Sequence, residues 1–181
     1  MERDSLACRT GTKKKESAMR QGLASILFVM LASLAWAASA SDVVRVSVPG
    51  QPAWQADRQA VAALPHTEVT AKAHDEPPAT WRGVSLAEVL KRAGLPLEKL
   101  RGRALAQYVR VTAADHYQVV FGLGELDPTL GNANVLLVDE RDGKPLSEDG
   151  PFRLLVPADA RPARWVRNVT TIEVLDGAAS P

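Results

Sequence analysis

The pattern of hydrophobic positions changes at about residue 40. Residues 23–37 form a mostly apolar run of 15 residues without a single charge, whereas the chain beyond residue 41 alternates apolar and polar positions over short stretches. Alternation with a period of two is typical of half-buried strands. It predicts seven strands, at residues 42–48, 66–71, 108–112, 117–121, 134–139, 152–156 and 169–175.

A helical pattern is clearest at residues 85–93. Ser85 is a good N-cap residue, Glu88 stands three positions later as its capping-box partner, and Gly94 followed by Pro96 ends the segment. A second short helix is expected at residues 55–64, closed by a proline.

Turn residues connect these elements into one domain. Residues 114–116 separate two alternating strands and predict a hairpin, and residues 141–145 contain an Asp-Gly turn. Residues 74–78 (HDEPP) predict a loop. The fold class expected is a single compact α+β domain over residues 41–176, a mixed, barrel-like sheet with one or two short helices, followed by a loose tail at 177–181.

The apolar run has the features of a secretion signal. Lys13, Lys14, Lys15 and Arg20 precede it, and the small residues 38–40 follow it in an A-x-A pattern. We therefore expect residues 1–40 to be a cleaved signal peptide, with Met19 as the true start and a periplasmic or otherwise exported product. The alternative is an uncleaved anchor helix, although the run is shorter than the roughly 20 residues that span a membrane.

Composition excludes several chemistries for the exported domain. The one cysteine, Cys8, lies in the segment expected to be removed, so no disulfide, thiolate metal ligand or cysteine nucleophile is expected. No basic block remains after residue 40, which argues against a nucleic-acid partner. The adjacent residues 74–76 (His-Asp-Glu) lack the spacing of known metal sites.

Five short segments occur in order over about 95 residues: 81–86 (WRGVSL), 115–117 (DHY), 142–146 (DGKPL), 152–157 (FRLLVP) and 163–167 (ARWVR), the last continuing to 172–174. Together they resemble the oxidoreductase molybdopterin-binding domain, the central domain of the sulfite oxidase family. The resemblance implies the fold of that domain.

The resemblance also implies a cofactor site. In the family one cysteine holds molybdenum, and the matching position falls near Ala71, where no side chain can supply a thiolate. The family's pterin and phosphate contacts correspond to Arg164 and Arg167, both of which keep a cation suited to anions. These arginines alternatively pair with carboxylates such as Asp159 or face solvent.

The turn residues Asp115, His116 and Tyr117 are included as candidate cofactor-binding residues on the same resemblance. Trp81 and Trp165 are expected to be core anchors rather than a stacking platform. Asn168 stands where the family often has tryptophan.

Together these features predict an exported module for ligand binding, sensing or accessory functions. It would hold a small anionic ligand or an envelope protein partner, with no catalytic residues, metal or cofactor expected and no membrane span after signal cleavage. Two alternatives remain open. One is a genuine molybdopterin-dependent oxidoreductase without a protein thiolate, and the other is an accessory domain that docks on a membrane sensor.

Overall fold

The computed structural model describes residues 42–73 and 76–178. The chain divides into two units, residues 1–40 and 41–181, and the described residues all belong to the second. The expected signal peptide lies outside the described residues. No helix within the described ranges is long and apolar enough to cross a membrane.

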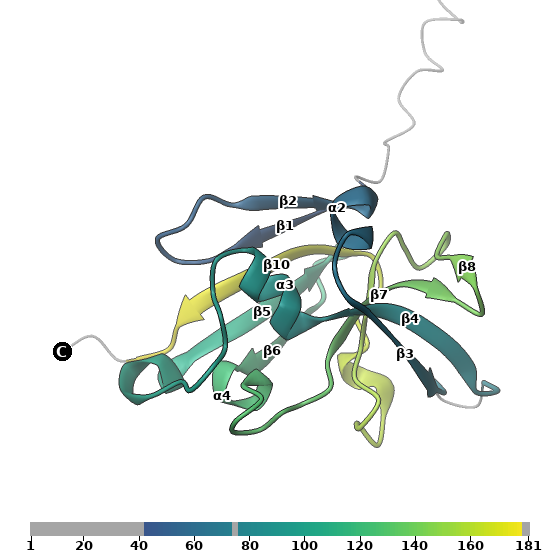
Figure 1. The fold of residues 1–181 in the computed structure, drawn as a ribbon. Helices are drawn as coiled ribbons and strands as arrows, with labels where there is room; N and C mark the ends of the chain where they lie inside the picture. Colours follow the sequence, from purple (N-terminus) through teal and green to yellow (C-terminus); the bar gives the residue numbers. More distant parts are fainter. Residues whose placement is uncertain (1–41, 74–75, 179–181) are drawn as a thin grey trace, which may run out of the picture. The chain divides into compact units, whose positions relative to one another are not determined.

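One sheet has five strands and contains both early and late parts of the chain (Figure 1). β1 pairs in parallel with β10, which places a late strand at the centre, and the other pairings are antiparallel. The order is β2 (Trp54–Asp57), β1 (Val43–Ser47), β10 (Val169–Asp176), β5 (Gln107–Ala113) and β6 (Gln118–Gly122).

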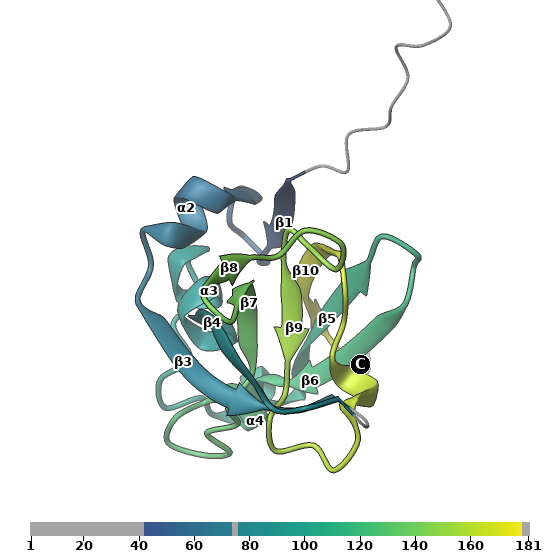
Figure 2. The ribbon, with the colours of Figure 1, turned by 90° about the vertical axis from the view of Figure 1, so that its right-hand side faces the viewer.

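The second sheet is antiparallel, and Figure 2 shows its strands facing the viewer. Its order is β3 (His66–Ala71), β4 (Ala79–Ser85), β7 (Leu136–Arg141) and β8 (Lys144–Pro145), and β9 (Arg153–Leu155) also pairs with β7. The β7–β8 turn contains Asp142 at φ 51° and Gly143 at φ 72°, the left-handed pair that a tight hairpin needs.

Short helices connect the strands. α3 (Leu86–Arg92) begins where predicted, because the Ser85 hydroxyl accepts a hydrogen bond from the Glu88 N–H at 3.2 Å. The others are α2 (Arg58–Ala62), α4 (Leu123–Leu126) and the 3₁₀ turns η1 (Gly102–Ala106) and η2 (Pro162–Arg164).

Apolar side chains from both sheets form one core. Fully buried members include Val44 and Ile172 from the five-stranded sheet and Leu137 and Leu154 from the other, with Phe121 beside them. The structure thus confirms the compact α+β domain with mixed sheet, and it contains the seven predicted strands within a residue or two.

Two parts of the sequence prediction need correction. The helix expected at residues 55–64 begins only at Arg58, because residues 54–57 pair with β1 as β2 and the Asp57 side chain then caps α2 by accepting from the Ala60 N–H at 2.7 Å. The central strand β4 was not predicted at all. Its interior Gly83 breaks the alternating pattern, yet the strand pairs with both β3 and β7.

Candidate functional site

A pocket of about 450 Å³ lies between the β5–β6 turn and the segment that leads into β10. Asp115 and Tyr117 line it from the turn, Asp149 from the segment before β9, and Trp165 and Arg167 from the segment before β10. Three separate parts of the domain therefore meet around one pocket.

The β5–β6 turn is held in place by its own polar groups. The Asp115 carboxylate accepts from the Tyr117 N–H at 3.0 Å, and His116 adopts a left-handed conformation at φ 68°. The Tyr117 hydroxyl then donates to the Ala163 carbonyl oxygen at 2.7 Å and ties the turn to the opposite wall. These contacts fix the width of the pocket.

Asp149 joins two arginines at the pocket wall. Its carboxylate accepts from Arg153 Nη1 at 3.0 Å and from Arg167 Nη1 at 3.4 Å. The Asp149 carbonyl oxygen accepts from the Asn168 N–H at 3.1 Å, which fixes the backbone on the same side. One carboxylate thus serves two guanidinium groups.

Arg153 is the buried member of this pair. It is 8% exposed, and its guanidinium lies 5.1 Å from the ring centroid of Trp81 and 5.8 Å from that of Trp165. Its Nε has no hydrogen-bond partner among the described residues. Burial lowers the pKa of Arg153 against the opposing effect of Asp149, and the positive charges of Arg167 and Arg141 lower it further.

The rings of Trp81 and Trp165 pack against the Arg153 guanidinium. Their rings meet edge to face with centroids 6.2 Å apart, and Arg141 lies 4.9 Å from the Trp81 centroid. Trp165 also donates its indole N–H to the Val156 carbonyl oxygen at 2.8 Å. Both are almost fully buried, which confirms the prediction that they anchor the core.

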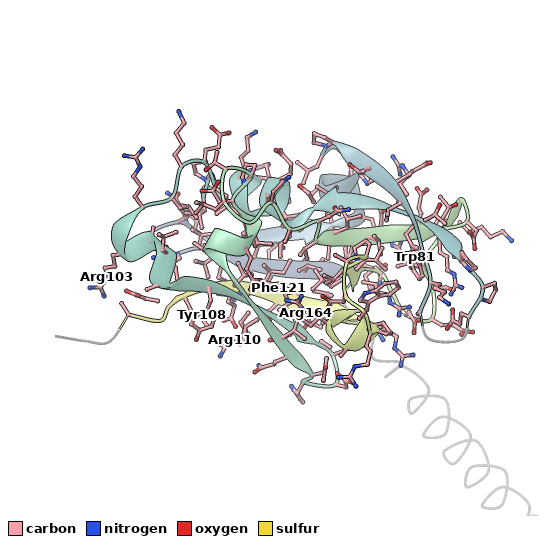
Figure 3. All side chains as sticks on the ribbon, turned by 90° about the horizontal axis from the view of Figure 1, so that it is seen from below. Trp81, Arg103, Tyr108, Arg110, Phe121 and Arg164 are labelled. Carbon is pink, nitrogen blue, oxygen red and sulfur yellow. The ribbon has the colours of Figure 1, made fainter. Side chains whose placement is uncertain are left out.

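Arg164 points to a different neighbourhood. Its guanidinium donates twice to Asp159, at 2.8 and 2.6 Å, and lies 4.7 Å from the Phe121 ring centroid, beside which it is drawn in Figure 3. The hydrogen bonds to Asp159 raise the pKa of Arg164. Arg164 is therefore engaged by the carboxylate that the sequence named as its alternative partner.

Three of the five candidate residues line the pocket together: Asp115, Tyr117 and Arg167. Arg164 and His116 are not among its lining residues. Arg164 is the last residue of the 3₁₀ turn η2, and its guanidinium is turned to Asp159. Sequence reasoning missed Asp149 and Arg153. The sequence did offer a signal for Arg153, because it is the one charged residue within the apolar segment 152–156.

The mixed sheets with few short helices define an α+β domain of the sulfite-oxidase-like class, and comparison with known proteins agrees. The model of the oxidoreductase molybdopterin-binding domain matches residues 55–180, so the chain belongs to this family. No curated protein matches the chain.

Among solved structures, the chain is similar to the sulfane dehydrogenase SoxCD from Paracoccus pantotrophus. The TM-score is 0.59 with 19% identity, over 79% of this chain. The match covers 40% of the SoxCD chain, so the likeness extends to the fold of one part of that enzyme.

The residues at the family's metal position do not fit molybdenum. Ala71 ends β3, and its carbonyl oxygen accepts the Trp81 indole N–H at 3.2 Å. Over residues 42–73 and 76–178 no group of three or more His, Cys, Asp or Glu side chains is placed to hold a metal ion. His74 and Asp75 lie outside the described residues. A soft thiolate ligand is therefore missing from this neighbourhood, while the arginines nearby suit an anion.

Proposed function

We propose that this chain is an exported ligand-binding or sensory module that has the molybdopterin-binding-domain fold and holds a small anion at the pocket beside Arg167. The observation that carries the proposal is the sharing of Asp149 by Arg153 and Arg167. An oxyanion between these two guanidinium groups would supply them with more acceptor oxygens than the single carboxylate provides.

The pocket has further properties that favour a small polar ligand. Its volume of about 450 Å³ lies within the roughly 300–1,000 Å³ of small-molecule sites. Its wall combines the Trp165 ring and Tyr117 with the Arg167 guanidinium. Arginine forms paired hydrogen bonds to phosphate and carboxylate groups, so a compact oxyanion matches this chemistry.

Titration calorimetry with inorganic phosphate at constant ionic strength tests the proposed site. Arg167→Gln should weaken binding about tenfold or more, because a hydrogen bond between charged groups contributes roughly 1.5–3 kcal/mol. Arg110→Gln is the control, since Arg110 pairs with Glu173 on the five-stranded sheet, outside the pocket. Equal phosphate binding by the wild type and Arg167→Gln would place the anion site elsewhere.

Family membership favours a second candidate, a molybdopterin-dependent oxidoreductase whose metal has no protein thiolate. We expect protein purified from cells supplied with molybdate to contain no stoichiometric molybdenum, because the residues around Ala71 lack the required ligand. Stoichiometric molybdenum and pterin in the purified protein would overturn the binding-module proposal and establish the second candidate.

Export is the remaining part of the proposal, and it rests on the basic, apolar and small-residue order of residues 13–40. N-terminal sequencing of protein from the cell envelope should find a mature chain that begins at or near Ser41. A chain that still carries residues 23–37 would show that this segment is an anchor. A pull-down from envelope extract, read for proteins and small molecules, then distinguishes a soluble ligand from a protein partner.

A further inference from the structure

We infer that Asp149 is a built-in competitor of the anion site: its carboxylate occupies the position between Arg153 and Arg167 that a compact tetrahedral oxyanion takes when it binds. This inference rests on the proposed function and adds its regulation. The ligand displaces the Asp149 carboxylate when it binds, and it does not enter an empty site.

The contacts of Asp149 support this role. Its two carboxylate oxygens face different arginines, Oδ2 at 3.0 Å from Arg153 Nη1 and Oδ1 at 3.4 Å from Arg167 Nη1. A phosphate oxyanion presents the same kind of acceptor atoms over a similar span. The Asp149 side chain therefore reproduces the charge and hydrogen bonds of the ligand that it would exclude.

The two arginines differ in how much they depend on Asp149. Arg167 has a side chain 65% exposed and keeps its hydration. The Arg153 side chain is 9% exposed, and its Nε has no hydrogen-bond partner within residues 42–73 and 76–178. A buried guanidinium requires an anionic partner far more than an exposed one. Arg153 consequently holds Asp149 in the site, and an entering oxyanion must replace that contact.

Asp149 is also placed to move away. Its side chain is 34% exposed, and it belongs to the connection between β8 and β9, whose anchor on this side is the backbone bond from Asn168. Rotation of the carboxylate into solvent leaves that backbone bond intact. The competition therefore requires no rearrangement of either sheet.

The test compares phosphate binding by the wild type, Asp149→Asn and Glu173→Gln. Asp149→Asn removes the competing charge and should lower the Kd for phosphate by about tenfold or more. Glu173→Gln is a matched control, because Glu173 also pairs with an arginine, is 33% exposed against 34% for Asp149, and lies outside the pocket. Its Kd should stay within about twofold of the wild-type value, since ionic strength screens distant charges.

Folding of the variant supplies an independent readout. Asp149→Asn leaves Arg153 without its carboxylate, so its melting temperature should fall without phosphate and rise more steeply with added phosphate than that of the wild type. If the variant does not fold in chloride, recovery of the folded circular dichroism spectrum in phosphate supports the inference. Failure to recover in phosphate would overturn it.

The remaining outcomes separate this inference from the proposed function. Equal binding by the wild type and Asp149→Asn, together with loss in Arg167→Gln, would overturn the competitor role and leave the anion site in place. Weaker binding by Asp149→Asn would show that Asp149 assists the ligand, which also overturns the inference. Absence of phosphate binding in both proteins would overturn the inference and the proposed site together.

Discussion

Arg153 carries a positive charge into the core, and its neighbours explain how the fold accommodates it. The guanidinium lies against the rings of Trp81 and Trp165, which contact each other edge to face, and it donates to Asp149. Aromatic faces attract a cation, and the methylene stem buries apolar area at the same time. The residue therefore contributes to packing as well as to the charge of the pocket.

Two substitutions at Arg153 separate these contributions. Arg153→Ala should lower the free energy of unfolding by about 2–4 kcal/mol, because it leaves a cavity beside the two tryptophans. Arg153→Met keeps most of the volume and should lower it by less than about 1.5 kcal/mol, since Asp149 retains Arg167 as a partner. Urea denaturation measures the free energy of unfolding of both variants. Similar losses in the two variants would show that charge dominates over packing.

Asp127 links pH to stability at the scale of a single residue. Burial opposes ionisation of its carboxyl, but hydrogen bonds from the Leu100 N–H and from the Thr129 hydroxyl and N–H outweigh burial and lower its pKa below 3.8. A pKa lowered by folding stabilises the protein above the unfolded-state value, and that contribution is lost as the pH falls through the folded-state value.

Asp127→Asn should therefore destabilise the domain at neutral pH and flatten the fall in urea midpoint below about pH 4. Asp115→Asn is the control, because Asp115 is exposed and its amide replacement can still accept from Tyr117. If the midpoint of Asp127→Asn falls with acid as steeply as that of the wild type, other carboxylates govern the acid transition.

At the scale of residues, the structure brings together some of the candidate residues that the sequence offered and not others. Arg167, Asp115 and Tyr117 were named on family resemblance and do meet at one pocket. Arg164 lies three positions from Arg167, and the resemblance implied pterin and phosphate contacts for both arginines, with pairing to carboxylates such as Asp159 as the alternative. The turn at η2 instead directs Arg164 to Asp159, and spacing alone does not reveal such a turn.

Among the secondary-structure elements, β4 shows how close backbone contact defines a strand. It pairs on both sides, and a register shift occurs between Arg82 and Gly83 where it meets β7. A β-carbon at Gly83 would overlap the Leu137 carbonyl oxygen and the Val138 backbone. Glycine is required here for space rather than for an unusual dihedral angle.

Gly83→Ala should consequently lower the free energy of unfolding by about 1–3 kcal/mol, as overpacking generally does. Gly122→Ala is a matched control in β6, because its β-carbon would meet only Cγ of Glu125, at 3.8 Å. The control should change stability by less than about 1 kcal/mol. Equal effects at the two glycines would mean that β4 can shift away from β7.

Elements with strong local signals were the ones predicted well. The Ser85 cap and the alternating pair around residues 114–116 gave α3 and the β5–β6 hairpin. β2 and β4 depend on partners distant in sequence, and their local patterns are short or interrupted by glycine. β2 and β4 form strands because they pair with these distant partners, and a short window of sequence does not show such pairing.

At the scale of the domain, β10 occupies the centre of the five-stranded sheet with β1 on one side and β5 on the other. Amide hydrogen exchange should be slowest in β10 and β5 and faster in β2, β3 and β6 at the sheet edges, because edge amides open without global unfolding. Mass spectrometry of exchanged peptides measures this order. Rapid exchange in β10 would indicate that the two halves of the sheet separate easily.

The position of β10 has a consequence for biosynthesis. A ribosome-bound chain that has not yet released residues 169–176 contains the β1–β2 pair and the β5–β6 hairpin without the strand that joins them. Such a nascent chain cannot complete its first sheet, and closing the gap between residues 47 and 169 carries a large loop entropy. Folding is thereby delayed until residues 169–176 have left the ribosome, and this delay would suit the export proposed above, by a translocase that accepts only unfolded polypeptide.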